Sequence, residues 1–343
     1  MVAKRVDLID RSIYKRTQSF YAVNSWVDIL YLLGPWMFGI AFLLLFPLFC
    51  QFNPYFLNIF VTAGIYALLG ISWTLLALLG LFSLGHAMYI AIPGYIIGVL
   101  NVNFHYPLYV SIAFAMILGT LITVAFHSAS LKIKGPYFLL VTFLVPMMLS
   151  QIAFLFPKFL YGEEGIFGIQ TLTYGAIPLS WGNYYLVVIL IFLVLIASRR
   201  FIGSKETGLI LRCIADNEYA VEASGLSVWK FKVLLFTVSS IIGNMAGTLY
   251  VITKGYVGPS SFTLTVSLLP LLGSVLGTIN SSLIGPIIGT YILTIVLESL
   301  RVTAFFKIII YAIILMIVVL ARPKGIFHYL EQTYHKFRRV YEQ

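Results

Sequence analysis

The sequence predicts an all-α polytopic membrane protein with about ten transmembrane helices. Hydrophobic residues make up 60% of the 343 residues and charged residues only 10%, whereas about 25% of the residues in a soluble domain are charged. No Asp, Glu, Lys or Arg occurs between Asp28 and Lys132, and the stretch from Val233 to Leu297 contains only Lys254. Charge-free stretches of this length are expected of consecutive segments that cross a lipid bilayer.

Ten apolar segments follow one another when the chain is divided at turn-forming and charged residues. A membrane-spanning helix needs about 20 predominantly apolar residues. The predicted spans are 30–50, 56–79, 87–100, 107–127, 137–157, 184–198, 232–252, 264–280, 283–300 and 305–321.

The distribution of basic residues predicts the orientation of these spans. All but four of the 22 Lys and Arg residues lie before the first span, in 128–136, in 199–232 or after residue 321. Because basic residues concentrate on the cytoplasmic side, both termini are expected there. The predicted organisation is a cytoplasmic segment 1–29, a membrane domain 30–321 and a cytoplasmic tail 322–343. The net charge of +10 then reflects topology and lipid contact rather than nucleic-acid binding.

The second and third predicted spans are separated by the sequence Gly80-Leu81-Phe82-Ser83-Leu84-Gly85-His86. Glycines and a serine at this place leave helix-terminal backbone groups available to polar ligands or to neighbouring helices. This segment is either a broken helix that lines a transport path or a tight connection between two ordinary spans. The candidate path residues are Ser83, Gly85 and His86, together with Thr142, which lies about a turn and a half into the span at 137–157.

Small residues recur at four-residue spacing in several of the predicted spans. This spacing lets helix backbones approach closely, where lipid provides no hydrophobic drive for association. The pattern predicts a compact bundle that can also face a second membrane subunit. The candidate packing residues are Gly94, Gly98, Gly243, Gly247, Gly273, Gly277, Gly285 and Gly289.

The main predicted cytoplasmic loop, 199–231, is expected to contain a short helix that ends at about Ser224. Asp216 is placed to cap its N-terminus, Glu218 lies in its first turn, and Gly225 is suited to end it. Two interpretations fit these residues equally: an element that docks onto a partner protein, or an amphipathic helix on the membrane surface, where Arg212 and nearby lysines contact lipid.

Several kinds of chemistry find no support in the sequence. The central spans contain no buried acidic or basic residue, which argues against an ion-coupled carrier. No phosphate-binding loop occurs, and the five His residues are scattered. We therefore expect neither enzymatic activity nor a bound metal or other cofactor in this chain.

Four segments resemble the LivM-type permeases of branched-chain amino acid and related urea or amide ABC importers. They are Phe82 to Ala87 followed by Gly94-Tyr95, Lys134 to Tyr137 followed by Val141-Thr142, Ser204 to Gly258, and Gly273 to Gly289. The resemblance covers roughly residues 57–325. The sequence departs from the family pattern at Leu81, Pro93, the acidic pair Glu163-Glu164 and Ser274-Val275-Leu276, which leaves the cargo open.

The resemblance implies a permease subunit of the cell inner membrane that imports branched-chain or other small amino acids by alternating access. It implies a second, homologous permease, an extracytoplasmic solute-binding protein and two cytoplasmic ATPases that bind ATP and magnesium. The loop helix would couple to an ATPase through Arg212, Asp216, Glu218, Ala223 and Gly225. The alternatives are a secondary carrier with discontinuous helices, which would need no ATPase, or ABC import of urea or short amides.

Overall fold

The computed structural model describes residues 43–131, 133, 135–175, 177–203, 205–277, 283–299, 313 and 316. The chain divides into two compact units, residues 1–51 and 52–343. Of the first unit the structure describes a helix at 43–49 and the turn after it. The elements below all belong to the second unit. The predicted terminal segments 1–29 and 322–343, most of span 30–50 and nearly all of span 305–321 lie outside the described residues.

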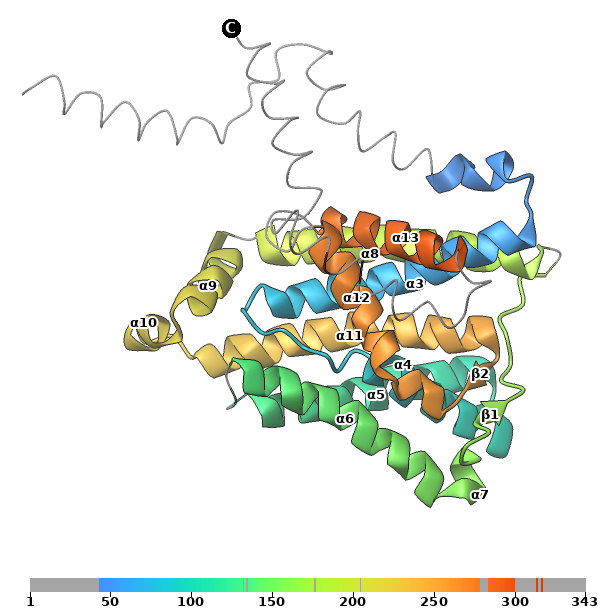
Figure 1. The fold of residues 1–343 in the computed structure, drawn as a ribbon, viewed down its shortest axis with the longest axis horizontal. Helices are drawn as coiled ribbons and strands as arrows, with labels where there is room; N and C mark the ends of the chain where they lie inside the picture. The colour runs from blue at the N-terminus through green and yellow to red at the C-terminus, as the bar shows by residue number, and fades with distance from the viewer. Residues whose placement is uncertain are drawn as a thin grey trace, which may run out of the picture. The chain divides into compact units, whose positions relative to one another are not determined.

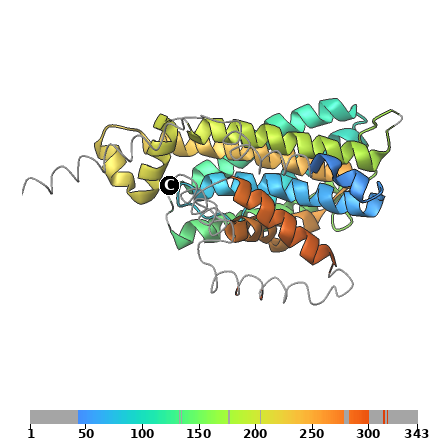
Figure 2. The same cartoon turned by 90° about the horizontal axis from the view of Figure 1, so that it is seen from above.

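Helix α3 (Pro54–Ala77) is the central helix of the second unit (Figure 1). Its start is fixed by Asn53, whose side chain accepts a hydrogen bond from the Tyr55 amide at 3.0 Å, and by Pro54 in the first helical turn. It contacts α8, α11, α12 and α13, and 83% of its most apolar stretch is buried. Figure 2 shows α3 between α8 and α13.

Helix α4 (Met88–Gly98) is short and continues into one π-helical turn, η1 (Val99–Asn103). It packs between α11 and α5 (Leu108–Ser130). Helix α6 (Pro136–Leu155) follows, beginning at a proline after Gly135, which has a φ of 61°. Only 22% of the apolar stretches of α5 and α6 is buried, so these two helices are peripheral in the unit.

A connection with little regular structure leads from α6 to α8. It contains the single turn α7 (Pro157–Leu160) and the short strand β1 (Ile166–Phe167). Helix α8 (Leu179–Gly203) is then followed by two short helices, α9 (Lys205–Asp216) and α10 (Glu218–Ala223).

The C-terminal half of the unit begins with the longest described helix, α11 (Val228–Lys254). Strand β2 (Tyr256–Val257) follows it and pairs antiparallel with β1. The 3-10 turn η2 (Pro259–Phe262) leads into α12 (Leu264–Gly277), which packs against α13 (Ile284–Ser299). Helices α9 and α10 lie at one end of the bundle, and β1 and β2 lie at the other (Figure 1).

The helical, multi-pass fold is confirmed for the described part of the chain. Five helices, α3, α5, α6, α8 and α11, are long and apolar enough to cross a membrane, and three shorter apolar segments correspond to α4 with η1, α12 and α13. Each coincides with a predicted span. Helix α8 extends beyond its predicted span of 184–198 at both ends, because helical structure continues into the polar residues that bound the apolar stretch. The total of ten spans stays a prediction.

Candidate functional site

The predicted coupling loop folds as α9 and α10, between α8 and α11 (Figure 1). Leu211 and Ile214 are buried on one face of α9, whereas Arg212 and Asp216 are exposed. Because apolar and polar residues occupy opposite faces, α9 is held to the bundle by one face and presents a charged face outward.

The predicted capping role of Asp216 is wrong. Asp216 is the last residue of α9, so it lies in helical conformation and cannot take the extended cap conformation. Asn217 is extended, with φ −157°, and its side-chain oxygen accepts a hydrogen bond from the Ala220 amide at 3.2 Å. Glu218 lies in the first turn of α10, and Gly225, after the helix end, has a φ of 85°. The loop therefore contains two helices joined at Asn217.

Glu218 faces α11 and forms an ion pair there. Lys232 Nζ donates a hydrogen bond to Glu218 Oε1 at 2.5 Å, and the Lys232 and Glu218 side chains are 4% and 20% exposed. A buried ammonium group is stable only with a charged or strongly polar partner. The pair therefore ties α10 to the first turns of α11.

The outer surface of the loop carries large apolar side chains. Leu209, Tyr219 and Trp229 are 64%, 73% and 61% exposed. Apolar groups rimmed by charged residues mark a contact with protein or membrane. The other predicted coupling residues are exposed on the same loop: Arg212, Asp216, Ala223 and Gly225.

The break between the second and third predicted spans is a mostly buried, non-helical segment, residues 78–87. Helix α3 ends at Ala77, Gly80 has a φ of 72°, and α4 begins at Met88. Figure 1 shows the chain running back alongside the helices before α4 begins. Ser83 and His86 are fully buried. Non-helical backbone among membrane helices is stable only where protein or a water-filled cavity satisfies its polar groups.

Side chains of neighbouring helices bind the backbone of this segment. Thr142 Oγ1 on α6 accepts a hydrogen bond from the Leu84 amide at 3.1 Å. Within the segment, Ser83 Oγ accepts one from the Gly85 amide, also at 3.1 Å. The predicted path residues Ser83, Gly85 and Thr142 therefore lie together, and His86 follows next in the chain.

Two further hydrogen bonds fix the ends of the segment. Ser267 Oγ on α12 accepts from the Ala87 amide at 2.8 Å, and the Trp73 indole on α3 donates to the Ser83 carbonyl oxygen at 2.8 Å. Three helices, α3, α6 and α12, thus hold one short stretch of backbone.

Polar side chains continue from His86 into the bundle. His86 Nε2 lies 3.5 Å from Ser72 Oγ, which donates to the Ser239 carbonyl oxygen at 2.9 Å. The His86 ring packs edge-on against Tyr89, with ring centroids 4.9 Å apart. The Tyr89 hydroxyl in turn lies 3.4 Å from His127 Nδ1.

Three buried atoms around this network lack a hydrogen-bond partner among the described residues. They are His86 Nδ1, His127 Nε2 and Asn244 Oδ1. His127 Nδ1 lies 3.1 Å from the Thr123 carbonyl oxygen, which can only accept, so His127 Nε2 carries the lone pair in the neutral ring. Each of these atoms retains hydrogen-bonding capacity that water or a polar solute can use.

The predicted packing glycines lie at close approaches between backbones. A Cβ at Gly247 on α11 would overlap the Tyr89 carbonyl oxygen on α4 and would lie 2.7 Å from Ile90 Cα. On α12, Gly277 lies against the Gly285 carbonyl oxygen of α13. The remaining predicted glycines lie at the α4–α11 contact, at the α12–α13 contact, or where α4 meets β1 and β2. They are Gly94, Gly98, Gly243, Gly273 and Gly289.

Several of these contacts involve residues that sequence analysis did not single out. Ser239 and Asn244 lie on α11 and Ser267 on α12, all fully or nearly fully buried. The sequence nevertheless indicated them, because polar side chains inside apolar spans generally face other helices. The pairing of Lys232 with Glu218 had no comparable signal, since it depends on the angle between α10 and α11.

The long apolar helices and the buried, non-helical segment among them define an integral, multi-pass membrane protein. Residues 55–320 match the family described as branched-chain amino acid transport system / permease component. The chain belongs to this family and is a permease subunit of an ABC importer, which confirms the predicted resemblance.

Two similar relatives are the high-affinity branched-chain amino acid transport system permease proteins LivM of Escherichia coli (strain K12) and Salmonella typhimurium (strain LT2). Each is 22% identical over 287 residues, which is 76% of this chain and 67% of the relative. No solved structure matches the chain.

Proposed function

We propose that this permease imports branched-chain or other small amino acids across the cell inner membrane, driven by ATP hydrolysis in partner subunits. The observation that carries the proposal is the family match over 55–320, which includes both the buried segment 78–87 and the loop with α9 and α10. The relatives reported above are permease proteins of high-affinity branched-chain amino acid transport systems.

The proposed complex contains a second permease, two cytoplasmic ATPases that bind ATP and magnesium, and an extracytoplasmic solute-binding protein. The exposed apolar side chains of Leu209, Tyr219 and Trp229 support docking of the loop onto an ATPase. Of the two interpretations of this loop, we favour docking, because the Lys232 and Glu218 ion pair fixes α10 to a membrane helix.

The proposed mechanism is alternating access. Closure of the ATPases moves α10, the ion pair passes this movement to α11, and Ser239 on α11 contacts Ser72 beside His86. In this scheme Arg212, Asp216, Ala223 and Gly225 form the outer docking surface, while Glu218 is the connection inward.

The proposed substrate path runs past segment 78–87. Ser83, Gly85, His86 and Thr142 supply polar groups to an otherwise apolar interior. The unpartnered Nδ1 of His86 supports exposure of this atom to water or substrate in another state of the transport cycle.

The test is uptake by the full importer, reconstituted in liposomes with ATP inside and the binding protein outside. We expect ATP-dependent uptake of labelled leucine, isoleucine or valine. Uptake of urea or acetamide instead of these amino acids would show that urea or short amides are the cargo. Uptake that follows an ion gradient without ATP would identify a secondary carrier.

A further inference from the structure

Helix α6 carries a proline in its interior, on the face that packs against the bundle. Pro146 is buried, and Thr142, one turn before it, is 2% exposed. Proline has no N–H, so Pro146 cannot donate the hydrogen bond that the Thr142 carbonyl oxygen receives in a regular α-helix. A helix bends most readily at such a position. The proline divides α6 into a first half, 136–145, and a second half, 147–155.

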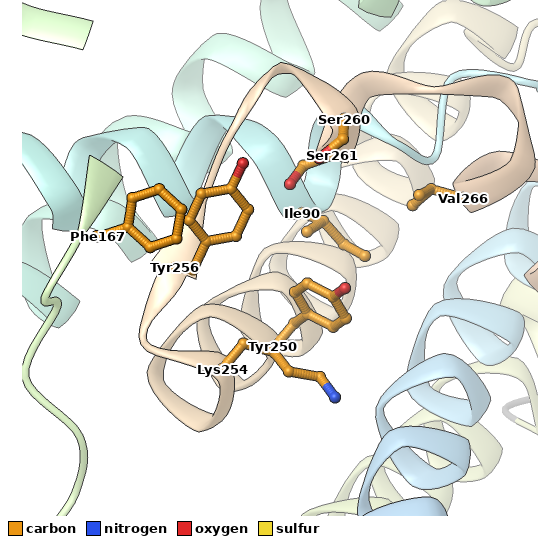
Figure 3. A pocket seen from close by; sticks show the side chains of 8 residues that line it. All are labelled: Ile90, Phe167, Tyr250, Lys254, Tyr256, Ser260, Ser261 and Val266. Atoms are coloured by element: carbon orange, nitrogen blue, oxygen red, sulfur yellow. The ribbon is translucent and has the colours of Figure 1, made fainter. Parts of the chain in front are cut away.

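The second half of α6 leads into a part of the chain that is fixed to the bundle. In the turn that follows, the Asn103 side chain on η1 donates to the Phe159 carbonyl oxygen at 3.0 Å and accepts from the Tyr161 hydroxyl at 2.9 Å. Strand β1 comes next, and its Phe167 packs on Tyr256 of β2 with ring centroids 4.3 Å apart. Figure 3 shows this ring pair beside a pocket of about 290 Å³. These contacts hold the far end of α6 in place.

The first half of α6 has more freedom. It begins after Gly135, which has a φ of 61°, and a Cβ at this position would meet no atom of the described residues within 4 Å. Its outward residues Leu140 and Leu144 are 53% and 51% exposed. Because lipid tails are as apolar as leucine, an outward movement of this half costs these side chains little.

The contacts of the first half with the bundle centre on Thr142 and Phe138. The Thr142 hydroxyl accepts from the Leu84 amide at 3.1 Å, and the Thr142 carbonyl oxygen would lie 2.9 Å from a Cβ at Gly85. Phe138 faces Phe236 of α11, with ring centroids 6.3 Å apart. The residue that closes on the buried segment, Thr142, therefore lies one turn from the proline.

We propose that α6 is jointed at Pro146 and that its first half is a gate over segment 78–87. In the released position this half swings away from the bundle, withdraws Thr142 from Leu84 and Gly85, and uncovers the polar groups of the segment. The second half stays anchored, so the movement is that of a hinge. The inference rests on the proposed function in that the segment borders the proposed substrate path.

Helix α4 also contains an interior proline, Pro93, but its surroundings differ. Helix α4 packs between α5 and α11. A Cβ at the neighbouring Gly94 would lie 2.7 Å from Val251 Cγ2 on α11 and 2.8 Å from Val257 Cγ2 in β2. This packing leaves α4 no room to swing. Pro93 is therefore a fixed feature and provides a matched control for Pro146.

The test measures distances by pulsed electron paramagnetic resonance on the full chain in nanodiscs, with Cys50 and Cys213 replaced by serine. Spin labels at Leu140 and Leu155, in the first and second halves of α6, are each paired with a label at Leu193 on α8. These three side chains are 53%, 72% and 57% exposed. We expect two distances for the pair that includes Leu140 and a single distance for the pair that includes Leu155.

Three substitutions test the proline itself. Pro146→Ala supplies the missing N–H and should lower the released population by up to about tenfold, the change that one backbone hydrogen bond produces in an equilibrium. Alanine favours a helix, so this variant should fold. Pro146→Gly also supplies the N–H but leaves the helix easier to bend, and should retain more of the released population. Pro93→Ala should leave both distance distributions unchanged.

Three results would overturn the proposal. They are a single distance for the pair at Leu140 in the wild-type chain, the same loss of the longer distance in Pro93→Ala as in Pro146→Ala, and two distances for the pair at Leu155. The last result would mean that α6 moves as a whole and not about Pro146.

Failure of this inference is separable from failure of the proposed function, because the distances are measured on the permease alone. If Pro146→Ala removes the released population but the reconstituted importer takes up no amino acid, the joint stands and the proposed cargo is wrong. If the importer takes up leucine with ATP, and Pro146→Ala changes neither the distances nor the rate of uptake, the function stands and the joint does not exist.

Discussion

Lys232 of α11 and Glu218 of α10 form an ion pair of 2.5 Å at the base of the loop that contains α9 and α10. The lysine is 4% exposed and is the first residue of the predicted span 232–252, so the expectation that the spans contain no buried acidic or basic residue is wrong at this position. A cation in this place costs desolvation energy that only a partner offsets. The pair therefore makes the position of α10 dependent on that of α11, which is what a coupling element requires.

Reversing one charge of this pair should uncouple the importer without preventing membrane insertion. Glu218→Lys places two cations together, so α10 should separate from α11, with a loss of about 3 kcal/mol in the interaction between them. We expect normal amounts of the permease in the membrane and a large fall in substrate-stimulated ATP hydrolysis in the reconstituted complex.

The matched control is Glu222→Lys, which makes the same change at an exposed position of α10 and should retain coupling. The double variant Glu218→Lys with Lys232→Glu should recover part of the stimulation, since it restores opposite charges. A Glu218→Lys permease with unchanged stimulation would refute the role of the pair.

The cap of α10 should depend on Asn217 and not on Asp216. Asn217→Ala removes the acceptor of the Ala220 amide, and loss of such a cap costs about 0.5 to 2 kcal/mol. Amide hydrogen exchange in residues 218–223 should accelerate in this variant. Asp216→Ala should leave that exchange unchanged, and faster exchange in Asp216→Ala alone would restore the original assignment.

The fold was predictable from sequence because lipid imposes one dominant rule. Spans of about 20 apolar residues must be helical, and the predicted segments coincide with α3, α4, α5, α6, α8, α11, α12 and α13. Boundaries were less predictable, as at α8, where Ser198 and the residues after it remain helical to Gly203.

The sequence predicted that the helix is broken at this site, but not which residues contact one another there. Gly80 and Gly85 indicated a break, because repeated glycines weaken a helix, and the structure has a non-helical segment there. That Thr142 binds the Leu84 amide and Ser267 the Ala87 amide depends on how α6 and α12 pack. Side chains far apart in the chain leave no local pattern of such pairing.

The contact between α4 and α11 should tolerate no side chain at Gly247. Gly247→Ala directs a methyl group into the Tyr89 carbonyl oxygen, and overpacking of this kind costs about 1 to 3 kcal/mol. We expect a lower thermal unfolding temperature in detergent. Gly119→Ala on α5 is the matched control, since its Cβ would lie 3.5 Å from Asn244, an ordinary contact, and alanine favours a helix over glycine by about 1 kcal/mol. Equal unfolding temperatures for the two variants would contradict the prediction.

Segment 78–87 should loosen when its hydrogen bond to α6 is removed. Thr142→Val keeps the shape of the side chain but leaves the part-buried Leu84 amide without its acceptor, at a cost of about 1 kcal/mol, the lower end of the range for a buried donor. We expect faster thiol labelling of a cysteine placed at Leu84, measured in a background with Cys50 and Cys213 replaced by serine. Thr142→Ser retains the hydroxyl and should label like wild type. If Thr142→Val also labels like wild type, then α6 does not hold the segment, and Thr142 loses its place beside the proposed path.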